Sequence, residues 1–172
     1  NVYVGPNTVI GYNSKIGNNS SILANVSIYH DISIGKNVYI DSGTVIGADG
    51  FGLFSERGIH HRIPHTGIVD IGDHVAIGSN CSVDRGTINS TIIGEHSKLD
   101  NLIQIAHNVV IGKGCIIAGQ AGIAGSAILG NYVTIGGQSG IAGHIEIGNN
   151  SVIATNSLVT KSLIENSFVS GI

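Results

Sequence analysis

The chain has 172 residues, a formal net charge of −3 at pH 7 and only 11% charged residues, so it lacks the basic footprint of a nucleic-acid-binding protein. It contains no run of about 18 apolar residues that would span a membrane, and no signal-peptide pattern at its start. Methionine is absent, which predicts that the sequence is an excerpt lacking both ends of a longer protein.

An aliphatic residue recurs every six positions in the first part of the chain, beginning the hexads at Val4, Ile10, Ile16, Ile22, Ile28, Ile34, Ile40 and Ile46. Strands have period two and helices have period 3.6, so neither alone keeps a period of six. A hexapeptide repeat is typical of a parallel β-helix, in which three hexads form one triangular coil. Residues 18 apart should therefore stack at the strand spacing of about 4.8 Å.

The repeat stops at residues 50–67, which contain no hexad. Most of the charged and aromatic exceptions gather there: Phe51, Phe54, Glu56, Arg57, His60, His61, Arg62, Pro64 and His65. A long irregular segment inside a regular solenoid predicts a loop extruded from one corner. Because the loops of repeat proteins often carry binding residues, we expect a flap that covers a cleft or reaches a neighbouring subunit.

After the loop the repeat restarts at Ile71, slips within residues 85–92 and then keeps one register over residues 93–159. We therefore expect a single all-β domain of about nine coils over residues 1–164. The tail, residues 165–172, loses the pattern and is expected to lead to an element outside the sequence. The hexads resemble those of hexapeptide-repeat proteins, and this resemblance implies left-handed winding and a homotrimer of side-by-side prisms.

Cys81 and Cys115 both fall at the small, inward position of a hexad. Two such residues indicate buried free thiols and give no disulfide framework. This usage favours a cytoplasmic protein.

Among the eight histidines, His107 has the most polar surroundings. It occupies an outward corner of its hexad and follows Asp100, Asn101 and Gln104. A neutral imidazole accepts a proton near neutral pH, so His107 is the candidate general base.

The 18-residue spacing places Gly125 and Gly143 next to His107 in the two following coils. Neither has a side chain, which predicts a groove about 10 Å long beside the imidazole. His144 would border the same groove.

Six motifs together resemble the UDP-3-O-acylglucosamine N-acyltransferase family of bacterial lipid A synthesis, over almost the whole chain. They are Gly50-Phe51-Gly52, Ile63-Pro64, Asp84-Arg85-Gly86, Asp100-Asn101, Gln104-Ile105-Ala106-His107-Asn108 and Gly143-His144. The resemblance implies a homotrimer with active sites between subunits. It also implies transfer of a 3-hydroxyacyl group from acyl carrier protein, whose 4′-phosphopantetheine carries the acyl chain, to the 2-amino group of a UDP-glucosamine derivative.

The resemblance implies that His107 is the base and His144 a second active-site histidine. With the thioester donor that the resemblance implies, the thioester arm would lie in the groove beside His107, and the Gly125 N–H would face its carbonyl oxygen. Substrate contacts are expected at Asp100, Asn101, Gln104, Gly143 and Phe51, and the floor of an acyl groove at Leu158 and Thr160. No metal and no bound cofactor are expected. The family's N-terminal uridine-binding domain and C-terminal helices are expected to be absent from this chain.

Three other classes remain open. The nearest is an O-acyltransferase acting on UDP-N-acetylglucosamine, or another hexapeptide acyltransferase. A zinc enzyme of the γ-carbonic anhydrase type needs a third histidine shortly after His144, where Asn149 and Asn150 stand. A non-catalytic or ice-binding solenoid would show a regular column of threonines, which the sequence does not have.

Overall fold

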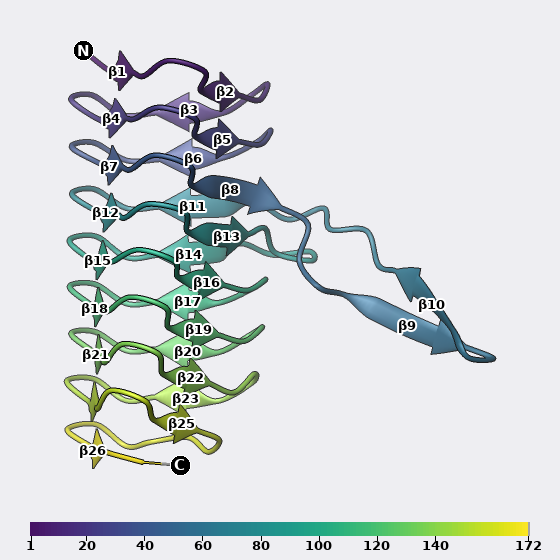
Figure 1. The fold of residues 1–172 in the computed structure, drawn as a ribbon, viewed down its shortest axis with the longest axis vertical. Coiled ribbons are helices and arrows are strands. Elements are labelled where there is room, and N and C mark those ends of the chain that lie inside the picture. The colour runs from purple at the N-terminus through teal and green to yellow at the C-terminus, as the bar shows by residue number, and fades with distance from the viewer. Residues whose placement is uncertain (172) are drawn as a thin grey trace.

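The computed structural model describes residues 1–171 and shows a prism built from three parallel sheets, to which successive hexads contribute in turn (Figure 1). The expected all-β parallel β-helix of about nine coils is confirmed. No helix in residues 1–171 is long and apolar enough to cross a lipid bilayer.

Short strands define the three faces. Sheet A contains β1 (Tyr3–Val4), β4 (Ser21–Ile22), β7 (Tyr39–Ile40), β12 (Ala76–Ile77), β15 (Lys98–Leu99), β18 (Ile116–Ile117), β21 (Thr134–Ile135), β24 (Val152–Ile153) and β26 (Phe168–Val169). Sheet B contains β2 (Val9–Ile10), β5 (Ser27–Ile28), β8 (Val45–Ala48), β13 (Ser82–Asp84), β16 (Gln104–Ile105), β19 (Gly122–Ile123), β22 (Gly140–Ile141) and β25 (Leu158–Val159). Sheet C contains β3 (Lys15–Ile16), β6 (Ser33–Ile34), β11 (Val69–Ile71), β14 (Thr91–Ile93), β17 (Val110–Ile111), β20 (Ile128–Leu129) and β23 (Glu146–Ile147).

The aliphatic residue that begins each hexad points into the prism. Ile22, Ile40 and Ile77 pair in register in sheet A, and each is 0% exposed. Burying one such side chain is worth about 1.5–3 kcal/mol, and the column repeats it coil after coil. Val4 and Ile10 remain exposed because no coil covers them at the N-terminal end.

Most corners of the prism contain one residue with a left-handed backbone. Asparagine fills this position most often, with φ between 54 and 61° at Asn7, Asn13, Asn19, Asn25, Asn37, Asn80, Asn108, Asn150, Asn156 and Asn166. Asparagine tolerates this region better than other residues with a side chain, which explains its recurrence. His144 occupies the same kind of position, with φ 60°.

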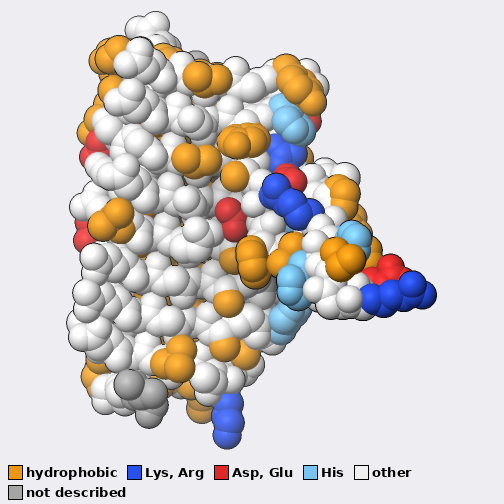
Figure 2. All heavy atoms as spheres, turned by 45° about the vertical axis from the view of Figure 1, so that its right-hand side comes forward, with side chains coloured by type: hydrophobic (Ala, Val, Ile, Leu, Met, Phe, Trp, Pro, Cys, Tyr) orange, Lys and Arg blue, Asp and Glu red, His pale blue; other side chains and the backbone are white. Residues whose placement is uncertain are grey.

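The extruded segment, called the arm here (residues 50–67), leaves the prism as expected but is not irregular throughout. β9 (Leu53–Glu56) and β10 (Ile59–Arg62) form an antiparallel hairpin that projects from the prism (Figures 1 and 2). The two residues between them, Arg57 and Gly58, have φ 50 and 79°, the sign that two-residue hairpin turns require.

The register slip is confirmed, because Ile71 pairs with Ile93, 22 residues further on. The extra residues include Arg85, which is only 2% exposed. Its Nε donates to the Gly47 carbonyl at 2.7 Å and its Nη2 to the His30 carbonyl at 2.8 Å. Arg85 thus ties β8 to the corner that follows β5, near the point where the chain leaves for the arm.

The C-terminal boundary differs from the expectation, because the solenoid continues past residue 164. Val152 pairs with Phe168 and Ile147 bridges to Leu163, a step of sixteen residues instead of eighteen. The last coil has two residues fewer, so the six-residue pattern is displaced by two positions while the strands still stack. Residue 172 of the expected tail lies outside the described residues.

Candidate active site

His107 lies at the corner between sheets B and C, two residues after the end of β16. Gly125 and Gly143 follow β19 and β22 at the same corner of the next two coils. The Ser126 N–H donates to the His107 carbonyl at 2.9 Å, and the His144 N–H donates to the Gly125 carbonyl at 3.1 Å. The structure therefore places the three residues in one column, as the 18-residue spacing predicts.

The ring of His107 lies against the backbone of Gly125. A Cβ added at Gly125 would be 2.7 Å from both Cε1 and Nε2 of His107, closer than side-chain contacts allow. Glycine at this position is thus needed for space, and the imidazole edge that carries Nε2 lies over the Gly125 main chain.

The opposite nitrogen of His107 has polar partners. Nδ1 is 3.1 Å from Asn108 Oδ1 and 3.4 Å from Thr87 Oγ1. The Thr87 N–H donates to Asn108 Oδ1 at 3.0 Å, which orients the amide oxygen toward the ring. Because an amide oxygen only accepts, we assign the ring proton to Nδ1, and Nε2 keeps the lone pair that a base needs.

The N–H of Gly125 has no acceptor in residues 1–171. At comparable corners an asparagine one coil further on fills this role. Asn131 Oδ1 accepts the Lys113 N–H at 3.0 Å, and Asn149 Oδ1 accepts the Asn131 N–H at 2.7 Å. The residue at the matching place above Gly125 is Gly143, which has no side chain, so this N–H stays available to a ligand.

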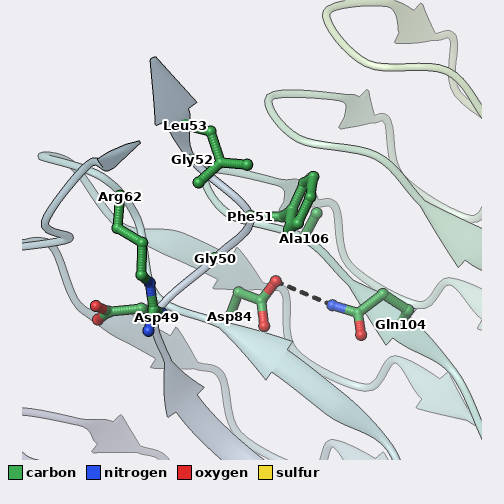
Figure 3. Close-up of a pocket in the computed structure, with 9 residues that line it drawn as sticks. All are labelled: Asp49, Gly50, Phe51, Gly52, Leu53, Arg62, Asp84, Gln104 and Ala106. Carbon is green, nitrogen blue, oxygen red and sulfur yellow. Dashed lines mark hydrogen bonds between the residues drawn. The ribbon is translucent and has the colours of Figure 1, made fainter. Parts of the chain in front are cut away.

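A pocket of about 460 Å³, called the polar pocket here because charged and polar side chains join the apolar ones in its lining, opens between the arm and sheet B (Figure 3). Gln104 Nε2 donates to Asp84 Oδ2 at 3.0 Å inside it, and Phe51, which is 87% exposed, lines another side. Burial raises the pKa of Asp84, while the bond from Gln104 opposes that rise. The pocket also contains Arg62 from β10 and Asp49, so it combines a cation, two carboxylates and an amide.

An apolar groove of about 280 Å³ continues from this pocket along sheet B. Gln104 and Leu158 lie at its two ends, and Gly122 and Gly140 form its floor between them. Its remaining walls are Ala106, Ile123, Ala124, Ile141 and Ala142, three of which directly precede His107, Gly125 and Gly143. The groove therefore runs along sheet B beside the column of His107, Gly125 and Gly143, whereas the 18-residue spacing predicts a groove at the two glycines themselves. Leu158 lines its far end.

Other expected site residues lie elsewhere on the prism. Asp100 and Asn101 occupy the corner between sheets A and B, where they accept the N–H groups of Gly119 at 3.1 Å and Ser79 at 2.7 Å. Within one chain, sheet B separates them from His107. Thr160 is exposed and does not line the groove.

The repeat spacing does not single out Asp84, Asn108, Thr87 or His65, although all four stand in or beside the six motifs. Asn108 follows His107 directly, which was the available signal. The other three reach the corner from β13, from the register slip and from the arm, and no spacing rule relates those segments. Within residues 1–171, no group of three or more His, Cys, Asp or Glu side chains is arranged to hold a metal ion.

Comparisons with protein families define the class. The bacterial transferase hexapeptide family (six repeats) matches residues 13–48, 90–125 and 126–161, and the hexapeptide repeat of succinyl-transferase matches residues 68–101. These matches cover well over half of the chain. The chain therefore belongs to the bacterial hexapeptide transferase family.

Individual relatives point to two related enzymes. UDP-3-O-acylglucosamine N-acyltransferases of Rickettsia bellii (strain RML369-C) and Rickettsia conorii (strain ATCC VR-613 / Malish 7) are 56% and 52% identical over 88 residues, or 51% of this chain. The match spans only about a quarter of the length of these curated relatives, 26% and 25%.

Among solved structures, the UDP-N-acetylglucosamine O-acyltransferase of Moraxella catarrhalis RH4 is similar with a TM-score of 0.92 and 31% identity, over 99% of this chain and 65% of that chain. The UDP-N-acetylglucosamine acyltransferase of Francisella novicida gives 0.91 and 26%, over 99% and 61%.

Proposed function

We propose that this chain is the β-helical domain of an acyltransferase that moves a 3-hydroxyacyl group from acyl carrier protein to the amino group of UDP-3-O-acyl-glucosamine. One observation carries the proposal. The lone pair of His107 Nε2 and the free N–H of Gly125 lie at one corner, beside an apolar groove. A base, an oxyanion donor and a site for an alkyl chain are what transfer of an acyl group to an amine requires.

In the proposed reaction, the acceptor nitrogen attacks the thioester carbonyl carbon and loses a proton to His107 Nε2. The carbonyl oxygen becomes an oxyanion and accepts a hydrogen bond from the Gly125 N–H. Collapse of the tetrahedral intermediate breaks the carbon–sulfur bond. The proton held by His107 goes to the leaving thiolate, which gives an amide and the free thiol of 4′-phosphopantetheine.

The apolar groove suits the acyl chain of the donor, and the polar pocket suits the sugar of the acceptor. The apolar groove toward Leu158 accommodates the acyl chain, because Gly122 and Gly140 on its floor have no side chain to fill it. The polar pocket with Asp84 and Gln104 accommodates hydroxyl and amine groups of the sugar, with Phe51 offering an exposed ring beside them.

The proposal includes a homotrimer. Phe54 and Ile59 on the arm are 52% and 61% exposed, which favours burial against another chain. Asp100 and Asn101, at the corner between sheets A and B, would then meet the substrate of a neighbouring subunit.

An O-acyltransferase acting on UDP-N-acetylglucosamine is the second candidate, favoured by the similarity over 99% of the chain to the Moraxella enzyme. The higher identity to the Rickettsia N-acyltransferases, 56% over 88 residues, favours the amine acceptor.

A comparison of the two acceptors distinguishes the N-acyltransferase from the O-acyltransferase. Purified protein is incubated with a 3-hydroxyacyl carrier protein and either UDP-3-O-acyl-glucosamine, which has a free amine, or UDP-N-acetylglucosamine, which has a free 3-hydroxyl. We expect amide product from the first and no ester from the second. Ester formation on UDP-N-acetylglucosamine, without reaction of the amine, would establish the second candidate instead.

A further inference from the structure

His65 lies against the side of the candidate base. It follows β10 at the end of the arm, is 7% exposed, and its ring stands edge-on to that of His107 with centroids 5.3 Å apart at 71°. The segment that leaves the prism at residue 50 thus returns to contact the corner that carries His107.

One ring nitrogen of His65 is paired and the other is buried without a partner, which lowers the stability of the fold. Nδ1 is 2.9 Å from the Ile63 carbonyl, which only accepts, so the proton belongs on Nδ1 and the lone pair on Nε2. Nε2 is fully buried and has no hydrogen-bond partner in residues 1–171. Because Nε2 makes no hydrogen bond, His65 touches its neighbours on that side through packing alone, while the bond at Nδ1 fixes the orientation of its ring.

Two glycines of the arm make room for both rings. A Cβ added at Gly50 would lie 2.8 Å from His107 Cβ, 2.9 Å from its Cδ2 and 3.0 Å from His65 Nε2. A Cβ added at Gly52 would lie 2.8 Å from His65 Cε1. Neither glycine has a positive φ, so both are needed for close approach and not for an unusual backbone.

We propose that His65 is a positioning residue that holds the His107 imidazole in the orientation keeping Nε2 over Gly125. The proposal rests on the function proposed above. Asn108 fixes the Nδ1 edge of the ring, and Gly125 lies beneath the Nε2 edge. His65 and Gly50 supply the remaining contacts to the side of the ring. Without the His65 ring, the His107 side chain gains room to rotate, and the population with Nε2 correctly placed falls.

The test compares His65→Ala, which removes the ring, with His65→Phe, which keeps a flat ring of similar size. The matched control is His96→Ala, because His96 also contacts another histidine, His74, with ring centroids 4.7 Å apart, in a stack with no contact to the His107 corner. We expect His65→Ala to lower kcat roughly 10- to 100-fold, with KM for the amine acceptor within about threefold of the parent. His65→Phe should recover most of the lost kcat, and His96→Ala should match the parent.

A second readout reports the ring itself. In protein labelled with ¹⁵N-histidine, with signals assigned through His107→Ala, the parent should show His107 as one tautomer protonated on Nδ1. His65→Ala should show averaging between tautomers at His107, and His65→Phe should restore the single form.

Three results would overturn the proposal: kcat of His65→Ala within about twofold of the parent, a rise in KM alone, or an unchanged His107 signal. If His65→Ala does not fold, His65→Phe decides, because a correctly folded His65→Phe protein with averaged His107 tautomers also contradicts it. His107→Ala measured in parallel distinguishes a failure of the proposed function from a failure of the role proposed for His65. Full activity of His107→Ala would refute the proposed function, whereas inactive His107→Ala with normal His65→Ala refutes only the role of His65.

Discussion

Gly125 leaves no room for a side chain beside the ring of His107. The methyl group of Gly125→Ala would collide with Cε1 and Nε2 of His107, and the half-buried ring can yield only by tilting away. We expect kcat to fall about 100-fold or more, with a small loss of melting temperature because the ring moves outward. Gly137→Ala, at a corner between sheets A and B, is the control and should keep its turnover. Equal turnover of the two variants would contradict the assigned role of Gly125.

Asp84 gives a prediction for stability as a function of pH. Burial raises its pKa in the folded protein above the unfolded value of 3.8, so the ionised carboxylate destabilises the fold at neutral pH. Asp84→Asn should therefore raise the melting temperature at pH 7. The difference should shrink as pH falls through the folded pKa and vanish below the unfolded one, where both states are protonated.

Thermal melts of parent and Asp84→Asn from pH 7 downward measure this difference. A variant that is less stable than the parent at pH 7 would show that the carboxylate is structural. Loss of activity in the same variant, alongside higher stability, would fit a side chain retained for substrate binding.

At the scale of single residues, the sequence predicts the column of His107, Gly125 and Gly143, because three hexads make one coil and residues 18 apart therefore stack. It does not predict Asp84 or His65 as partners of that corner. Asp84 enters through β13 and His65 through the arm, and the path of an inserted segment back to the prism follows no repeat.

Among the elements, β19 and β22 form the groove because each begins with glycine. A Cβ added at Gly122 would meet nothing within 4 Å, so Gly122→Val should fold as well as the parent. Its side chain would fill the groove between Gln104 and Leu158. Turnover of long 3-hydroxyacyl donors should fall about tenfold or more, while short donors react nearly as before.

Thr134→Val, on the outer face of sheet A, places a valine on a strand away from the groove and should leave both donors unaffected. Unchanged turnover of the long donor by Gly122→Val would place the acyl chain elsewhere.

The regular coils are predictable from sequence because every inward position has the same neighbours one coil away. The hairpin in the arm and the final coil are not. The hairpin depends on Arg57 and Gly58 adopting positive φ between two strands that carry no hexad. The coil ending at β26 keeps its stacking while losing two residues, which shifts the pattern that periodicity relies on.

For the whole molecule, the exposed apolar side chains predict self-association. Ile92 and Ile128 on sheet C and Ile116 on sheet A are 37 to 53% exposed, in addition to those on the arm. Light scattering at micromolar concentration should give three 17.7 kDa chains, or about 53 kDa. A single 17.7 kDa species would contradict the trimer and the shared site it implies.

The most direct test of the central claim is turnover of His107→Ala with the amine acceptor, measured together with its melting temperature. The side chain lies at an outward, half-buried corner, so the fold should survive. We predict a loss of about 10² to 10⁴ in kcat, the usual contribution of a general base, with a nearly unchanged melting temperature. His144→Ala, whose side chain is exposed, should lose less. Near-normal turnover of a correctly folded His107→Ala protein would contradict the account.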